Sequence, residues 1–133
     1  MPKSIQTKTS QDHLEHAQVI LESLEGLLLQ TFVSYDQYDI SDAKAKAMLS
    51  VCEVLANGAL EDIESASAKN KISLSTCITQ AHGIAVVLSE LSRLTLSKGY
   101  TAAAIHGLFL AAEQLNESLE SAVNAVIDLR CAA

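Results

Sequence analysis

Apolar side chains recur at alternating steps of three and four residues along four separate stretches of this chain. Such spacing places them on one face of an α-helix, because an α-helix completes a turn in about 3.6 residues. Proline, which interrupts helices, occurs once, at position 2. The sequence therefore predicts an all-α fold built from long amphipathic helices.

The first half of the chain predicts two helices. The first begins at Thr9 or Ser10, where a hydroxyl can cap the first turn, and fades between residues 31 and 35. A loop is expected over 34–40, after which Asp39 or Ser41 caps the second helix, and the small polar segment 65–71 predicts the next turn. The apolar stripe of the first helix is Leu14, Ala17, Leu21, Leu24 and Leu28, and that of the second is Ala45, Met48, Cys52, Leu55, Ala59 and Ile63.

The second half predicts two more helices. Ser73 or Ser75 caps the third, and the sequence Ser97-Lys98-Gly99 predicts its end, because glycine adopts the left-handed conformation that closes many helices. Thr101 then caps the fourth helix. The stripe of the third helix is Cys77, Ala81, Ile84, Leu88 and Leu91, and that of the fourth is Ile105, Leu108, Ala112, Leu115, Leu119, Ala122, Val126 and Leu129.

Four amphipathic helices with short links predict an up-down-up-down antiparallel four-helix bundle. Two helical hairpins that open and interlock with a second copy are the alternative. A length of 133 residues suits one domain, expected over 10–133 after a flexible arm at 1–9. Each half is a hairpin with small residues along its stripe, so duplication of a helical hairpin stays an open hypothesis.

The charge balance disfavours two classes of partner. Sixteen acidic and nine basic residues give a net charge of −7, which disfavours binding to nucleic acid or to an anionic membrane surface.

No stretch is long and apolar enough to span a membrane, and residues 1–13 lack the apolar run of a signal peptide. The three cysteines, without close spacing, are interpreted as small side chains in a reducing compartment. A cytoplasmic protein is expected, with no nucleic-acid or membrane partner.

Parts of both halves resemble a known group of proteins. The segments Val87–Leu94, Gly107–Leu110 and Ala112–Leu115 are similar to the helical hairpin of small uncharacterised proteins common in pseudomonads, and residues 51–60 look similar in the other half. The resemblance implies a helical fold and a bacterial or phage source. It implies no activity, cofactor or site residue.

Four histidines are the first places to look for chemistry. His13 and His16, three residues apart, could chelate a metal, but no third or fourth ligand is evident, so polar residues at a helix start are the favoured interpretation. His82 and His106 each precede a glycine and flank an apolar stripe. If their helices are adjacent, these two could meet and titrate near neutral pH.

No enzyme signature is recognisable. A di-iron bundle would need inward-pointing Glu-x-x-His pairs, which this sequence lacks, and nucleophile-elbow, phosphate-loop and cysteine-pair patterns are also missing. The acidic run Glu61, Asp62 and Glu64 is interpreted as a solvated face. We therefore expect no catalytic activity, no cofactor and no metal.

The apolar content exceeds what one small core can hide, since 49% of the residues are hydrophobic. The most apolar runs, Ile84–Leu88 and Leu108–Ala112, lie in the third and fourth predicted helices. Gly83 and Gly107 border them, and each costs about 1 kcal/mol relative to alanine inside a helix. Neutral drift and the close approach of another helix both stay open as explanations.

These features predict a non-enzymatic protein-interaction module that uses an apolar surface of the third and fourth helices, either as a homodimer interface, which is the favoured interpretation, or as a groove for a protein partner. The candidate interface residues are Gly83, Val86, Val87, Gly107, Phe109 and Leu110. One alternative is a small phage- or host-encoded inhibitor or regulator of a larger protein. Another is a helical bundle that senses a small molecule.

Overall fold

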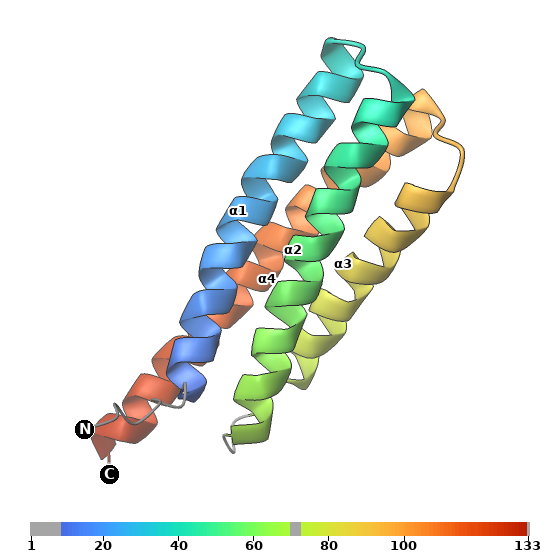
Figure 1. Cartoon of the computed structure of the whole chain (residues 1–133). Helices are drawn as coiled ribbons and strands as arrows, with labels where there is room; N and C mark the ends of the chain where they lie inside the picture. The colour runs from blue at the N-terminus through green and yellow to red at the C-terminus, as the bar shows by residue number, and fades with distance from the viewer. Residues whose placement is uncertain (1–8, 70–72, 133) are drawn as a thin grey trace, which may run out of the picture.

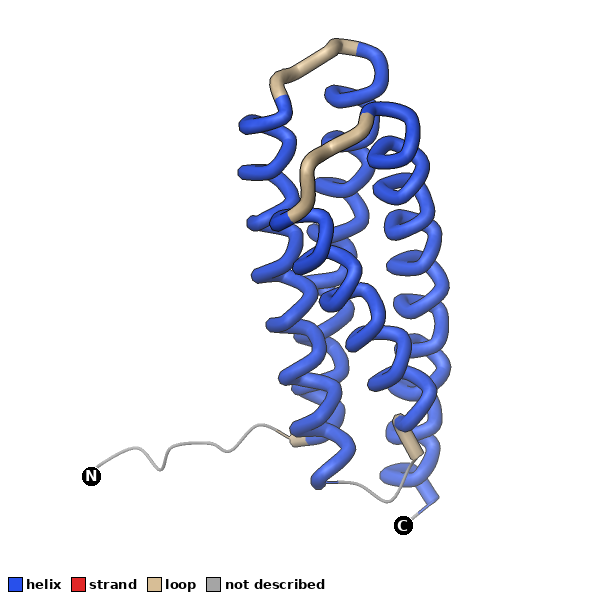
Figure 2. Tube along the Cα trace, turned by 90° about the vertical axis from the view of Figure 1, so that its right-hand side faces the viewer, coloured by secondary structure: helices blue, strands red, loops and turns tan. Residues whose placement is uncertain are grey.

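The computed structural model describes residues 9–69 and 73–132, which form four helices (Figure 1). They are α1 (Ser10–Gln37), α2 (Asp42–Lys69), α3 (Ser75–Arg93) and α4 (Lys98–Ala132). Each helix runs antiparallel to the next, and contacts join α1 to α2, α2 to α3, α3 to α4 and α4 back to α1. The loops 38–41 and 94–97 lie toward one end of the bundle, whereas α1 begins and α4 ends at the other (Figure 2). The predicted up-down-up-down four-helix bundle is confirmed.

The core follows the predicted stripes closely in α1, where all five stripe residues are buried. In α2, Leu49 and Ala56 occupy the central positions that the prediction gave to Met48 and Leu55, which are only half-buried. Both choices alternate steps of three and four, so amphipathic spacing alone does not decide between them. Packing of α2 against α1 and α3 buries Leu49 and Ala56.

The stripes of α3 and α4 are buried except at their ends. Leu91 of α3 is half-buried, and Leu129 of α4 is 53% exposed, which contradicts its predicted place in the core. The last turns of α4 extend beyond the start of α1 (Figure 1), so the apolar pattern continues where no helix is left to cover it.

The start of α1 is as predicted, and its end is not. Thr9 caps the helix by accepting a hydrogen bond from the backbone N–H of Asp12, whose side chain accepts one from the backbone of Thr9. Residues 34–37, predicted as loop, are helical. Buried Tyr35 explains the extension, because its hydroxyl donates to Asp42 Oδ1 at 3.0 Å and ties the last turn of α1 to α2.

Of the two predicted caps for α2, Ser41 is the one used. Its Oγ accepts a hydrogen bond from the backbone N–H of Lys44 at 3.2 Å. Asp39 instead has a φ of 56°, a left-handed conformation that aspartate tolerates better than most residues. Its carboxylate forms an ion pair with Lys98, which joins the first loop to the start of α4.

The second turn begins later than predicted, because α2 continues to Lys69. Residues 65–69 are therefore helical, and 70–71 lie outside the described residues. Ala66 is buried, and its carbonyl accepts a hydrogen bond from the hydroxyl of Ser10 at 3.3 Å. A contact with α1 thus stabilises a polar segment that looks like a turn in the sequence.

The caps of α3 and α4 differ from the predictions. Leu74 precedes α3 without a side-chain cap, and the hydroxyls of Ser73 and Ser75 bond to each other instead. Lys98 and Gly99 open α4 rather than close α3. Thr101 lies inside the first turn of α4, where its hydroxyl accepts from the backbone N–H of Ser97 at 3.1 Å. Helix α3 ends early because Leu96, in the following loop, is buried against Tyr35, Ala45 and Ala102.

Candidate functional site

One side of the bundle has an uncharged surface. Residues 75–89 of α3 and 99–112 of α4 include no aspartate, glutamate, lysine or arginine. The two helices are antiparallel neighbours, so the two runs lie against each other over part of their lengths. In a chain with a net charge of −7, this concentration of uncharged surface on one pair of helices is the feature that most distinguishes a candidate site.

A shallow groove of about 350 Å³ separates the outer sides of these helices. Helices α3 and α4 also pack less extensively than any other neighbouring pair. The lining is mostly apolar and small: Thr79, Gln80, Gly83, Ile84 and Val87 from α3, and Leu108, Ala111 and Gln114 from α4. Gln80 Oε1 is buried there without a hydrogen-bond partner among the described residues, an arrangement that is unfavourable for an isolated chain.

Apolar side chains project beside the groove. Val86, Val87 and Leu110 are 45%, 41% and 50% exposed. Val87 lines the groove itself, and Gly107, one turn before Ala111, lies on the same side of α4 as that residue. We call the surface formed by Gly83, Val86, Val87, Gly107 and Leu110 the α3–α4 face.

The structure places Phe109, the remaining candidate, on a different side of α4. Its side chain is half-buried and packs against the core. Its ring centroid lies 6.4 Å from that of His106, which in turn lies 5.0 Å from the ring of Phe32 on α1. Phe109 therefore belongs to the junction of α4 with α1 and is not part of the groove next to α3.

The two glycines of the α3–α4 face have no neighbour that would explain them. A Cβ atom built at Gly83 or Gly107 meets nothing within 4 Å. At Gly58, by contrast, it would contact Ile20 Cδ1 at 3.6 Å. Close helix approach within the chain therefore does not account for Gly83 or Gly107.

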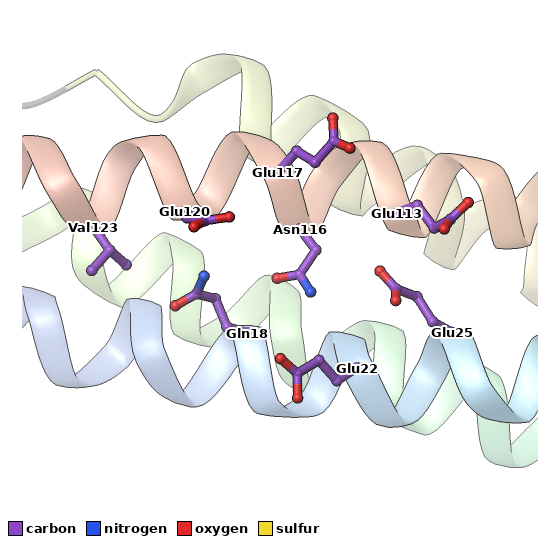
Figure 3. A pocket seen from close by; sticks show the side chains of 8 residues that line it. All are labelled: Gln18, Glu22, Glu25, Glu113, Asn116, Glu117, Glu120 and Val123. Carbon is purple, nitrogen blue, oxygen red and sulfur yellow. The ribbon is translucent and has the colours of Figure 1, made fainter.

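The opposite side of α4 borders a groove of different chemistry, about 490 Å³ in volume (Figure 3). Five glutamates from α1 and α4 line it together with two amides and a valine: Gln18, Glu22, Glu25, Glu113, Asn116, Glu117, Glu120 and Val123. Burial, followed by repulsion from Glu113, raises the pKa of Glu25, and a hydrogen bond from Asn116 partly offsets this. The sequence analysis missed this groove, because its carboxylates come from helices far apart in the chain.

A third cluster joins the start of α1 to the end of α2. Asp62 is buried, its Oδ1 lies 2.9 Å from His13 Nδ1, and its Oδ2 pairs with His16 Nδ1. Lys69 Nζ lies 3.3 Å from His13 Nε2. The interpretation of the acidic run as a solvated face is therefore wrong for Asp62, because α1 supplies two partners that offset its burial. No group of three or more His, Cys, Asp or Glu side chains in the described ranges could hold a metal ion.

The other pair of histidines is not brought together. Both side chains are exposed, and the ring of His106 has a neighbour on α1, Phe32, at a centroid distance of 5.0 Å. Within residues 9–69 and 73–132, no hydrogen bond or ring contact joins them. Adjacent helices are thus not enough for contact, because the two rings are on different sides of their helices.

Two of the three cysteines are core residues, as predicted from their positions on apolar stripes. Cys52 and Cys77 are buried, whereas Cys131 is exposed. Burial raises the pKa of the Cys52 thiol to about 11, and it also raises that of Cys77. Both thiols are therefore protonated at neutral pH and are poor nucleophiles.

Comparison of the chain with protein-family models, with curated proteins and with solved structures finds no match. The resemblance to the hairpin proteins of pseudomonads stays a prediction. None of the helices in the described residues combines the length and the apolar character needed to cross a membrane. Any function must therefore be argued from the α3–α4 face, the carboxylate groove and the His–Asp cluster themselves.

Proposed function

We propose that this chain is a non-enzymatic protein-interaction module that associates with a second copy of itself through the α3–α4 face. The observation that supports this most strongly is the absence of charge there. Two copies that each have a net charge of −7 repel one another, and the repulsion is smallest when they meet through surfaces without carboxylates. The groove between α1 and α4, with its five glutamates, is the least suitable side for such a contact.

Two glycines on the face are compatible with this contact, although Gly26 on α1 has the same open space beside it. A helical glycine is less favourable than alanine by about 1 kcal/mol, and nothing inside the chain requires one at position 83 or 107. A missing side chain lets a second backbone come close. A helix of another copy, packed along the groove, would give both glycines the neighbour that the isolated chain does not.

The composition of the surface fits an interface. Val86, Val87 and Leu110 provide exposed apolar area, and the polar side chains of Thr79, Gln80 and Gln114 line the groove beside it. Interfaces between proteins commonly combine an apolar centre with a polar rim. A donor from the second copy could also satisfy the buried Gln80 Oε1.

Sedimentation equilibrium of the purified chain over a range of concentrations tests this proposal. The informative variant is Val86→Glu combined with Val87→Glu, which puts two carboxylates on the face. Its control is Val51→Glu combined with Val54→Glu, because these valines are exposed on α2 and the same charge is added. Circular dichroism checks that each variant remains helical.

We expect the wild-type chain and the α2 control to form dimers, and the α3 variant to be monomeric and folded. A wild-type chain that stays monomeric at all concentrations would overturn the proposal. Equal weakening by both variants would also reject it, because the effect would then come from net charge and not from the face.

A further inference from the structure

Helix α3 is attached to the rest of the bundle by packing, without any polar link among the described residues. Its side-chain hydrogen bonds and its ion pair are local, such as the pair between Arg93 and Glu90 at 2.7 Å. None of these interactions reaches α1, α2 or α4. Leu74 precedes α3 without a side-chain cap, which leaves the first turn of the helix weaker.

The other three helices are tied to one another by polar contacts. Asp62 of α2 pairs with His13 and His16 of α1. Glu25 of α1 and Asn116 of α4 share a hydrogen bond. The junctions of α1 with α2 and with α4 are also the most extensive in the bundle, whereas the two junctions of α3 are the least extensive. Helices α1, α2 and α4 therefore form a unit to which α3 is only weakly attached.

The contribution of α3 to the core is also small. Its buried residues comprise three small and two large side chains: Cys77, Ala81, Ala85, Ile84 and Leu88. Hydrophobic stabilisation grows with the apolar area removed from water, so three of these five side chains contribute little. Packing of α3 in the bundle also keeps Gln80 Oε1 buried without a partner among the described residues, whereas water could bond to this oxygen in a detached helix.

We infer that α3 is a lid that detaches as a unit while α1, α2 and α4 remain folded, and that its opening exposes the apolar surface of the core that it covers. Proteins open locally in cooperative segments, and the segments that open first have few buried apolar contacts. Leu96, in the loop after α3, is buried with Tyr35, Ala45 and Ala102, and this contact sets the boundary of the moving unit. The inference goes beyond the proposed function and does not depend on it, because it concerns a single copy of the chain.

The cysteines of the chain report this opening without any substitution. Cys77 is buried on α3, Cys52 is buried on α2, and Cys131 is exposed on α4. Iodoacetamide alkylates a thiolate with release of iodide, so a buried cysteine reacts only when its surroundings open. The full chain is labelled at about pH 8, near the ordinary pKa of an exposed thiol, and peptide mass spectrometry measures the rate at each cysteine. Each rate is divided by that of the same cysteine in the urea-unfolded chain.

The chain concentration is kept low enough for sedimentation to show a monomer, and the reagent concentration low enough for closing to outpace alkylation. Each labelling rate then reports the equilibrium population of the open form. The measurement is repeated at several urea concentrations below the unfolding transition, because urea favours forms that expose more surface.

Two conservative variants separate the opening of α3 from unfolding of the whole chain. Ile84→Val shortens a side chain that is buried only while α3 is in place, so it should raise the rates at Cys77 and Cys52 by about two- to tenfold. Tyr35→Phe removes the hydrogen bond to Asp42, which the open form keeps. It should therefore raise the rate at Cys52 about two- to tenfold and leave that at Cys77 unchanged. Circular dichroism verifies that both variants are folded.

In the wild-type chain, we expect Cys131 to react first and Cys77 to react about tenfold or more faster than Cys52, with a rate that rises with urea. Equal rates at Cys77 and Cys52 would overturn the inference, because α3 would then leave only when the whole chain unfolds. A rate at Cys77 that neither urea nor Ile84→Val changes would also overturn it, since the reagent would then reach the thiol without any opening. Faster labelling of Cys52 would show instead that α2 opens before α3.

Discussion

The two grooves that border α4 differ in chemistry although the same helix forms one wall of each. Beside α1, Glu113, Glu117 and Glu120 of α4 line a groove whose other wall includes Glu22 and Glu25. The Glu117 carboxylate points away from α1 (Figure 3). Toward α3, α4 presents Leu108, Ala111 and Gln114 to an uncharged wall. One helix thus separates an acidic flank from a neutral one.

Each flank is unfavourable for an isolated chain, but for a different reason. On the α1 side, burial and then repulsion from Glu113 raise the pKa of Glu25. On the α3 side, apolar side chains are exposed to water. A buried amide oxygen without a partner among the described residues does not distinguish the flanks, because each groove has one, Gln80 Oε1 and Asn116 Oδ1. Repulsion keeps other acidic proteins away, whereas exposed apolar surface favours contact. Under the proposed self-association, the acidic flank would disfavour contact with a second copy on the α1 side.

The largest expected effect is a loss of folding stability when a core side chain between the two flanks of α4 is shortened. Leu115 of α4 is fully buried in the core, and Leu115→Ala should lower the free energy of unfolding by about 2–5 kcal/mol. Leu110→Ala, five residues earlier on the exposed side, should change it by less than about 0.5 kcal/mol. Urea unfolding followed by circular dichroism measures both, at a chain concentration low enough for sedimentation to show a monomer, because unfolding of a dimer would also include the loss of its interface. A large loss in Leu110→Ala would place that residue in the core and remove it from the α3–α4 face.

A second change makes the neutral flank resemble the acidic one. Thr79→Glu combined with Gln114→Glu adds a carboxylate on each wall of the α3–α4 groove. Self-association should weaken by about tenfold or more, since like charges from both copies would meet in the interface. The control is Gln18→Glu, which adds a carboxylate to the groove that is already acidic. Sedimentation equilibrium should show no comparable loss in that control, and an equal loss would show that the location of the charge is irrelevant.

The glycines sharpen the comparison further, because they separate folding from association. Gly83→Ala and Gly107→Ala should each stabilise the isolated chain by about 0.5–1 kcal/mol, since a Cβ atom meets nothing within 4 Å at either position. The same variants should weaken self-association if a second helix packs against the glycines. Gly26→Ala on α1, where a Cβ atom also meets nothing, should stabilise folding alone. Thermal unfolding and sedimentation together distinguish the two effects, and identical association in all three variants would exclude glycine contacts.

The fold could be predicted from the sequence because steps of three and four determine which side of a helix is buried. The C-terminal ends of α1 and α2 could not, because they depend on contacts between helices. Buried Tyr35 extends α1 by bonding to Asp42, and Ser10 bonds to the backbone of Ala66 near the end of α2. Neither contact can be inferred from local composition, which suggested a loop at both places.

The candidate sites also differ in how far the sequence alone predicts them. The uncharged runs of α3 and α4 are continuous in the sequence, so the apolar surface could be anticipated, although Phe109 could not be separated from it. The carboxylate groove and the cluster of Asp62 with His13 and His16 are built across helices. Their members look like ordinary solvated residues until the register between the helices is known.

The smallest expected effect concerns the acidic flank. The pKa of Glu25 is raised above its ordinary value of 4.5, so the folded chain binds this proton more tightly than the unfolded chain does. Ionised Glu25 therefore lowers stability above its folded-state pKa, and this penalty disappears as the pH falls below 4.5. Glu25→Gln should accordingly raise the free energy of unfolding at pH 7 by no more than a few tenths of a kcal/mol, because it removes a repelled carboxylate that solvent largely screens.

This gain should diminish as the pH is lowered and should vanish near pH 4, where the wild-type carboxyl is protonated as well. Glu61→Gln, on the exposed side of α2, changes the net charge by the same amount and provides the control. Chemical unfolding at a series of pH values, with each variant compared to the wild type, measures the difference. A pH-independent gain in Glu25→Gln, or an equal gain in Glu61→Gln, would mean that general net charge and not crowding in the α1–α4 groove destabilises this flank.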